Sequence, residues 1–282
     1  MTVLEVTSEE YHADAIADQP CLSASIANLL LTRSPRHAYE QHPKLNPFYR
    51  ARKAEEKFDV GTALHSLLLE GQNAIMVVEH DSWRSNAAKE ARELARADGL
   101  TPLLRDQWDE LEPMFDALRY QLEQHTAEPK PFTAGKPEQT LVWEEAGVTC
   151  KARLDWLRDD RAAIDDLKTT RASAEPRAWA RTALGMGADV QCAMYLRGAH
   201  AYGWDPVWRF VVIESEPPFA LSVIDLAPDA LALAEDKFEW ALAKWRSCLE
   251  SGEWPAYPTR VASIEAPGYA ETQWLEQKEM AA

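Results

Sequence analysis

The sequence has few cysteines, and none of them lie close together. The 282-residue chain holds Cys21, Cys150, Cys192 and Cys248, with no CxxC motif and no closely spaced Cys/His pair. This spacing argues against a zinc module, a disulfide framework and the four-cysteine ligand set of an iron–sulfur cluster. We therefore expect four buried thiols that serve packing.

Long apolar runs are also missing. No stretch reaches the roughly 18 apolar residues that a membrane-spanning helix needs, and the first five residues lack the basic and apolar regions of a signal peptide. With 46% hydrophobic and 27% charged residues, the composition is that of an ordinary globular protein. There is no P-loop, nucleophile elbow or internal repeat. These features predict an intracellular protein that uses neither a membrane nor ATP.

Residues 148–156 alternate in polarity. This period of two predicts a strand with one apolar and one polar face, and the polar face ends in Asp155. The apolar set comprises Val148, Cys150, Ala152, Leu154 and Trp156, and the polar set comprises Thr149, Lys151, Arg153 and Asp155.

A second strand is predicted after a charged turn at residues 158–161. In this strand Asp166 and Lys168 share one face, whereas Asp165 points to the other. Spacing and face therefore favour Asp166 over Asp165 as the partner of Asp155. Two carboxylates and one lysine can then meet across adjacent strands.

These residue types suit the hydrolysis of a phosphodiester. Attack by water requires a hard cation on oxygen ligands, a bound water of lowered pKa and neutralisation of charge in the transition state. Asp155 and Asp166, with the carbonyl oxygen of Leu167, would bind Mg²⁺ or Mn²⁺, and Lys168 would orient the water or pair with the phosphate. An Asp-x-Lys triplet by itself is more often the solvated face of a hairpin. The assignment therefore depends on the other motifs.

Four motifs occur in the order of a known nuclease family. They are Ser23-x-Ser25 with Leu29-Leu30 and Ser34-Pro35, Gly61-Thr62-x-x-His65, Asp155 followed by Asp-Leu-Lys-Thr-Thr at 166–170, and Gln191-x-x-x-Tyr195. This ordered set resembles the exodeoxyribonuclease VIII (RecE-like) branch of the PD-(D/E)xK superfamily, which is related to the RecB nuclease domain and the lambda-type exonucleases. The resemblance covers residues 22 to 200.

The resemblance implies an α/β fold with a PD-(D/E)xK restriction-endonuclease-like core, in which helices flank a mixed central sheet, and a helical N-terminal part. It implies a Mg²⁺-dependent exonuclease, with Mn²⁺ as a substitute, that resects linear duplex DNA 5′→3′ and leaves 3′ single strands for an annealing protein. The setting would be the cytoplasm of a bacterial or phage-infected host cell, and the assembly a ring-shaped homo-oligomer. Two alternatives stay open: a distributive nuclease of this fold acting on single-stranded or branched DNA, and a catalytically silent recombination scaffold.

The resemblance also assigns roles to four residues outside the two strands. His65 and Glu138 would bind the metal, and Gln191 and Tyr195 would contact the nucleotide or position the lysine. Each has a structural alternative. His65 lies in an apolar helical pattern that is typical of a packing residue, and Gln191 and Tyr195, four residues apart, could pack on one another.

We expect a single nuclease domain over residues 1–282, with a mainly helical part at 1–130, the nuclease core at 131–254 and a tail at 255–282. The tail is expected to pack over the domain or at a subunit contact. The predicted helices span Ser23–Leu31, Pro35–Gln41, Lys53–Glu70, Asn86–Ala97, Arg105–His125, Glu175–Leu184, Asp189–Tyr202 and Pro228–Glu250, and the later strands span Val207–Glu214 and Ala220–Asp225.

The net charge of −16 conflicts with DNA binding, which normally depends on an excess of Lys and Arg. Net charge reports long-range repulsion rather than the local field, so a locally positive channel is compatible with an acidic exterior. Binding would still be weak unless a closed ring holds the DNA. The basic residues expected near the site are Lys151, Arg153, Lys168, Arg171, Arg177 and Arg181.

Overall fold

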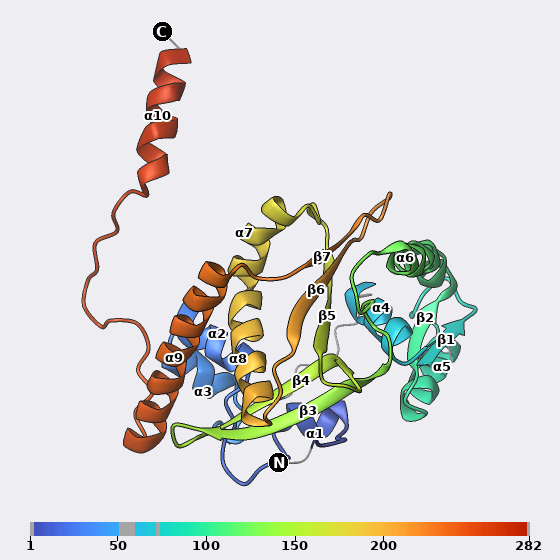
Figure 1. Ribbon diagram of the computed structural model, residues 1–282, viewed down its shortest axis with the longest axis horizontal. Helices are drawn as coiled ribbons and strands as arrows, with labels where there is room; N and C mark the ends of the chain where they lie inside the picture. Colours follow the sequence, from blue (N-terminus) through green and yellow to red (C-terminus); the bar gives the residue numbers. More distant parts are fainter. Residues whose placement is uncertain (1–2, 51–59, 72–73, 281–282) are drawn as a thin grey trace.

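The structure is a computed structural model that describes residues 3–50, 60–71 and 74–280. A mixed sheet forms its centre, built from β3 (Gly135–Glu145), β4 (Val148–Arg158), β5 (Ala163–Thr170), β6 (Val207–Glu214) and β7 (Leu221–Ile224). The strands lie in the order β3-β4-β5-β6-β7 (Figure 1). β5 and β6 run parallel, and the other neighbours run antiparallel. The α/β class with a mixed sheet is as predicted.

Local sequence patterns explain the first three strands. Ala146 and Gly147 join β3 to β4 with φ angles of 49° and 79°, the left-handed values that a tight hairpin turn needs. In β4, Cys150, Ala152 and Leu154 are buried, as the alternation predicts. β5 follows with Asp166 and Asp165 on opposite faces.

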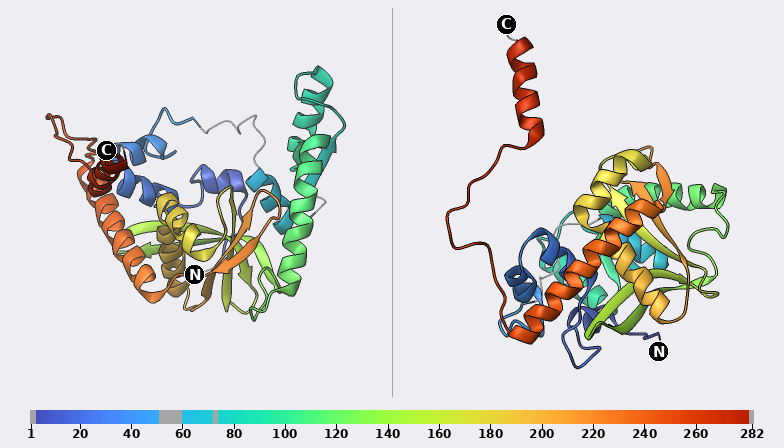
Figure 2. Two further views of the ribbon diagram at one scale, coloured as in Figure 1. Left: turned by 90° about the horizontal axis from the view of Figure 1, so that it is seen from above. Right: turned by 60° about the vertical axis from the view of Figure 1, so that its left-hand side comes forward.

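One face of the sheet packs against helices from both ends of the sequence. They are α2 (Ala24–Thr32), α3 (Pro35–Gln41), α7 (Pro176–Met186), α8 (Ala188–Ala201) and α9 (Pro228–Ser251). Ser23 is the N-cap of α2 and Pro35 begins α3, as the sequence predicts. Figure 2 shows α9 lying along the outside of this layer. The largest fully buried side chains of this core are Trp179, Phe210, Phe238 and Trp245.

The opposite face packs against α4 (Val60–Leu69) and α6 (Arg105–Gln124), with Leu167 of β5 in the shared core. Beyond these helices lie β1 (Ile75–Val78) and β2 (Thr101–Leu104), a separate parallel pair that the sequence did not predict, and α5 (Asn86–Ala97) (Figure 1). The predicted helix Lys53–Glu70 lies partly outside the described residues. Its described part is α4.

Residues 3–23, which we call the N-terminal segment, cross the polar side of the β3–β4 hairpin. The segment pairs with β3 at Leu4 and with β4 at Leu22, and it contains the short helix α1 (Ser8–His12). None of this was predicted, because these residues show no helical or strand period.

Asp14 ties the N-terminal segment to the sheet. Its side chain is fully buried; Oδ1 accepts a hydrogen bond from Lys151 Nζ at 2.7 Å, and Oδ2 accepts one from the N–H of Cys21 at 3.1 Å. Lys151 is only 5% exposed. The polar face predicted for β4 is therefore not solvated at Lys151, because the segment covers it.

The alternation predicted for β4 is wrong at its end. Leu157, rather than Trp156, shares the buried face with Leu154. Trp156 instead packs its ring edge against Phe132, with the centroids 6.1 Å apart. The pairing of β3 with β4 is interrupted at the same level by Glu138, whose φ is 58°.

Beyond Tyr257, whose ring contacts His37 of α3, the C-terminal tail does not pack over the domain as one expectation had it. Residues 255–269 are exposed and lead into α10 (Gly268–Met280), which contains no buried residue and projects away from the body (Figures 1 and 2). α10 was not predicted, because its apolar residues follow no helical period.

All four cysteines are free and buried, as predicted. In the part of the chain that the structure describes, no helix is long and apolar enough to cross a membrane.

Asp14→Asn should lower the free energy of unfolding by about 3 kcal/mol, because it leaves Lys151 buried without its counter-charge. Asn tolerates the left-handed backbone at residue 14, where φ is 59°, so the change removes charge and keeps the geometry. Urea unfolding measures the loss, with Asp18→Asn, at an exposed position of the same segment, as the control. Equal losses in the two variants would contradict the importance of the ion pair.

Candidate active site

Two acidic residues stand where β4 and β5 separate. The strands form ladder pairs only at residues 156–157 and 164–165. Asp155 and Asp166 come directly beyond these pairs, one on each strand. The N–H of Leu167 donates to Asp155 Oδ2 at 2.9 Å, so it bonds a carboxylate rather than a carbonyl oxygen of β4. Because the strands diverge here, the N–H of Leu167 is free to bond a side chain of the site.

Asp166 is 1% exposed and has two partners. Its Oδ2 forms an ion pair with Lys168 Nζ, and its Oδ1 accepts a hydrogen bond from Gln191 Nε2 at 2.7 Å. Burial raises the pKa of Asp166 to about 6; the charge of Lys168 opposes this rise, and the charge of Asp155 adds to it. A further cation at this position would therefore stabilise the ionised form.

His65 reaches the same region from α4, whose neighbouring leucines anchor it against the opposite face of the sheet. Its Nε2 lies 3.2 Å from Asp155 Oδ1, and its Nδ1 lies 3.5 Å from Glu138 Oε1. Burial lowers the pKa of His65, but the hydrogen bond and charge of Asp155, with the charge of Glu138, raise it above its ordinary value. The imidazole is thus held between two carboxylates.

Asp155 and Asp166 differ in their ease of ionisation. Burial raises the pKa of Asp155, but the hydrogen bond from His65 and the charges of His65 and Lys168 bring it below its ordinary value. Burial lowers the pKa of Lys168, whereas Asp166 and Asp155 raise it, so the amine stays charged. Two neighbouring carboxyl groups with separated pKa values are typical of sites that perform acid–base or metal chemistry.

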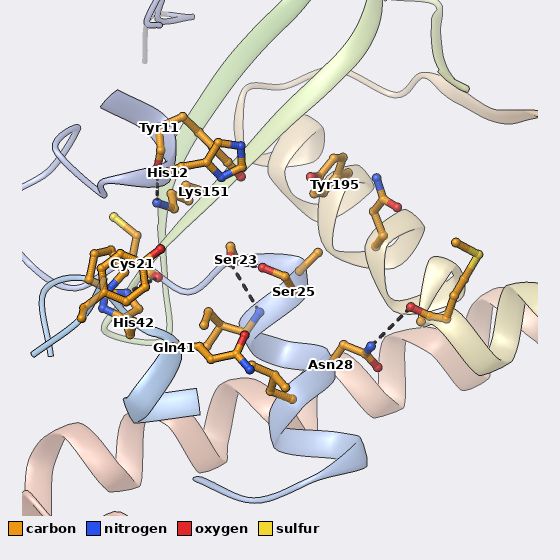
Figure 3. A pocket seen from close by; sticks show the side chains of 18 residues that line it. Tyr11, His12, Cys21, Ser23, Ser25, Asn28, Gln41, His42, Lys151 and Tyr195 are labelled. Carbon is orange, nitrogen blue, oxygen red and sulfur yellow. Dashed lines mark hydrogen bonds between the residues drawn. The ribbon is translucent and has the colours of Figure 1, made fainter. Parts of the chain in front are cut away.

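A cavity of about 580 Å³ opens beside these residues. Gln191 and Tyr195 of α8 form one wall, and Tyr11, Ser23 and Ser25 belong to the walls that face it (Figure 3). Among the described residues, no Asp or Glu lines the cavity. In a chain of net charge −16, this cavity therefore stands out by the absence of acidic side chains from its described lining, and it meets the site at Gln191, which bonds Asp166.

The structure brings the predicted site residues together from five elements. They are His65 on α4, Glu138 on β3, Asp155 on β4, Asp166, Leu167 and Lys168 on β5, and Gln191 and Tyr195 on α8. Asp165 lies on the opposite face, where its Oδ1 is 2.5 Å from Arg209 Nε. Its exclusion from the site agrees with the predicted register. The roles of the assembled residues as ligands or catalysts stay predictions.

Three of the basic residues expected near the site are paired with acidic side chains. Lys151 pairs with Asp14, Arg153 pairs with Glu138, and Lys168 pairs with Asp166. No local pattern predicts the first pair, because its members are 137 residues apart in the chain. No motif marks Tyr11 either.

The donor set suits a divalent cation, although the described residues include no group of three His, Cys, Asp or Glu side chains already converged on one point. His65 lies beside both Asp155 and Glu138, and Asp155 is near enough to Asp166 for its charge to raise the pKa of Asp166. Carboxylate oxygens are the ligands that Mg²⁺ prefers. His65 and Lys168 hold the positions where a cation would neutralise these acids. The residues fit a metal, and its binding would compete with these internal cations.

Asp166→Asn should change how stability depends on pH. The pKa of Asp166 is raised from 3.8 to about 6, so between these values the folded state keeps a proton that the unfolded state has released. This contribution is present at low pH and is lost as the pH rises through about 6. In EDTA, the wild type should therefore lose stability relative to the variant across this window, as measured by urea unfolding. A constant difference, like that expected for the exposed control Asp159→Asn, would contradict the buried acid.

Comparison with known proteins places the fold. A family model described as a PDDEXK-like domain of unknown function matches residues 25–267, and no curated protein matches the chain. A proposed exonuclease from Eubacterium rectale superposes with a TM-score of 0.58 at 15% identity, over 95% of this chain and 98% of that one. A phage-related exonuclease from Haemophilus somnus gives a TM-score of 0.29 at 15% identity, over 68% of this chain and 95% of that one. The fold is that of the PD-(D/E)xK class, and the chain belongs to the PDDEXK-like domain family of unknown function.

Proposed function

We propose that this protein is a metal-dependent exodeoxyribonuclease that hydrolyses phosphodiester bonds from the ends of linear duplex DNA. The observation that carries the proposal is the meeting of Asp155, Asp166 and Lys168 at the divergence of β4 and β5, with His65 and Gln191 in contact with the two acids. This set is hard to explain as a solvated hairpin face, because Asp166 is buried.

Mg²⁺, with Mn²⁺ as a substitute, would be held by His65, Glu138, Asp155, Asp166 and the carbonyl oxygen of Leu167. When bound, the cation would lower the pKa of a water and neutralise charge on the phosphate. Gln191 fixes one oxygen of Asp166 and leaves the other to Lys168. Lys168 can then turn its amine from Asp166 to the phosphate or the attacking water.

The cavity beside the acids supplies a place for one DNA strand. Its walls offer hydroxyl, amide and imidazole groups and, among the described residues, no carboxylate, so a phosphodiester meets no repulsion there. The acidic exterior offers little attraction for the rest of the duplex. A ring-shaped homo-oligomer that encloses the DNA would keep the duplex bound where electrostatic attraction is too weak to do so.

The finer assignment follows the RecE-like resemblance of the motifs. It comprises 5′→3′ polarity, 3′ single-stranded products and delivery of these products to an annealing protein in a bacterial or phage-infected cell. The four motifs support this part of the proposal.

End-labelled substrates test the activity. With Mg²⁺, linear duplex labelled at the 5′ end should release label early, whereas label at the 3′ end should persist on a shortening strand, and closed circular duplex should stay intact. EDTA should stop the reaction. Nicking of the circle would replace the exonuclease assignment with an endonuclease. Degradation of single strands alone would indicate the distributive alternative, and no cleavage of any substrate would leave a scaffold.

Three single variants test the site. Asp166→Asn and Lys168→Ala should each reduce cleavage by at least about 10³-fold, because one removes a metal ligand and the other the cation beside the phosphate. Asp165→Asn is the matched control: it should lower the melting temperature, since Arg209 loses its buried partner, but keep normal activity per folded molecule. The reverse pattern at 165 and 166 would show that the assigned register is off by one residue.

A further inference from the structure

A second cavity, of about 590 Å³, adjoins the cavity beside the acids, which we call the first cavity. His12, Gln41 and Tyr49 line both, so the two cavities lie next to each other. Figure 3 shows His12 and Gln41 in the lining of the first cavity. Phe48 and Arg50, which follow α3 in the chain, belong to the lining of the second. The second cavity is therefore the next space for a strand that leaves the first on this side.

Phe48 presents an aromatic ring to solvent at this second cavity. It is 86% exposed, whereas no other Phe, Tyr or Trp in the described part of the chain exceeds 66%. Tyr49 beside it is half-buried. A flat apolar ring that stands in water gains free energy when another flat ring covers it. Phe48 is therefore suited to hold a planar ligand.

The turn that carries Phe48 is held by hydrogen bonds to Asn46, which is only 8% exposed. Asn46 Oδ1 accepts a hydrogen bond from the N–H of Phe48 at 2.9 Å, and Asn46 Nδ2 donates to the carbonyl oxygen of Glu40 at 2.9 Å. The N–H of Tyr49 donates to the carbonyl oxygen of Asn46 at 2.9 Å. The backbone thus holds the ring at the cavity in advance, which lowers the entropy cost of binding a ligand there.

The charges around the second cavity suit a polyanion. Glu40 is the one acidic residue in its described lining. The carboxylate of Glu40 pairs with Arg36 Nη2 at 2.5 Å and accepts a hydrogen bond from Asn46 Nδ2 at 3.1 Å. Arg50 adds a guanidinium group to the same lining. The negative charge is thus compensated, and a cation that suits a phosphate stands beside the aromatic ring.

We propose that the second cavity is a nucleotide subsite: Phe48 stacks on one base of the strand that occupies the first cavity, and Arg50 pairs with the adjoining phosphate. This inference rests on the proposed nuclease function for the presence of DNA in the first cavity. A base inside a duplex is already stacked on its neighbours, so Phe48 takes a base that has left the stack. Because every base has a π-face, such stacking adds affinity without sequence preference, as the removal of successive nucleotides requires.

Fluorescence anisotropy of a labelled single-stranded oligothymidylate with the full chain tests this inference. EDTA prevents cleavage, and low ionic strength preserves the phosphate contacts. Phe48→Ala should raise Kd about tenfold, the scale of one base–aromatic stack, whereas Phe48→Trp should keep the wild-type Kd or lower it. Tyr120→Ala is the matched control, because it removes a 66% exposed ring from α6 on the opposite face of the sheet and should leave Kd unchanged. Since Phe48 is exposed, its variants should melt near the wild-type temperature.

An abasic strand of the same length separates stacking from other roles of Phe48, because it keeps the phosphates and lacks the bases. Phe48→Ala should bind this strand as well as the wild type does. Equal losses on the two strands would overturn the inference, as would a wild type that binds neither strand. A wild type that cleaves duplex with Mg²⁺ while Phe48→Ala keeps its Kd would remove this inference alone. Stacking-dependent binding without cleavage of any DNA would remove the nuclease function and keep the subsite.

Discussion

The early separation of β4 from β5 is the constraint on which the site depends. The strands share ladder pairs only at residues 156–157 and 164–165, so the backbone beyond them is free to bond other groups. The N–H of Leu167 bonds a carboxylate, and the exposed edge of β4 accepts Leu22 of the N-terminal segment. Continued pairing would close the gap in which Asp155 and Asp166 now approach each other.

The charges inside this gap are balanced before any ligand arrives. Each of the three acids faces a cationic side chain of the protein: His65 faces Asp155, Lys168 faces Asp166, and Arg153 faces Glu138. In a chain with net charge −16, these pairs prevent mutual repulsion of the acids from opening the fold. A divalent cation that bound here would have to displace these partners, because the carboxylates are already paired.

The two ends of the chain differ in how they relate to the core. The N-terminal segment is held by a buried ion pair at Asp14 and by backbone pairing with β3 and β4, whereas α10 has no buried residue. Both lie largely or wholly outside the family-matched range. Position relative to that range therefore does not indicate whether a segment contributes to the site; burial and pairing do.

The sequence by itself determined the elements whose signals are local. Alternation set the faces of Asp165, Asp166 and Lys168. Ser23 as N-cap and Pro35 as first helical residue set the starts of α2 and α3, because strand period and helix-start signals depend on neighbouring residues alone. The order of the motifs indicated the nuclease-like class. Where a strand keeps its regular alternation, as β5 does, side-chain direction follows from spacing.

Only the tertiary structure decided how these elements meet. The pairing of Lys151 with Asp14, the hydrogen bond from Lys151 to the carbonyl oxygen of Tyr11 and the burial of Leu157 in place of Trp156 have no local signal. Each depends on where distant segments pack or on an irregular backbone at Glu138. The β1–β2 pair was likewise not predicted, because a strand of four residues is too short to show a clear alternation of polar and apolar residues. Burial and partnership come from the packing of the whole chain, so spacing along the sequence cannot fix them.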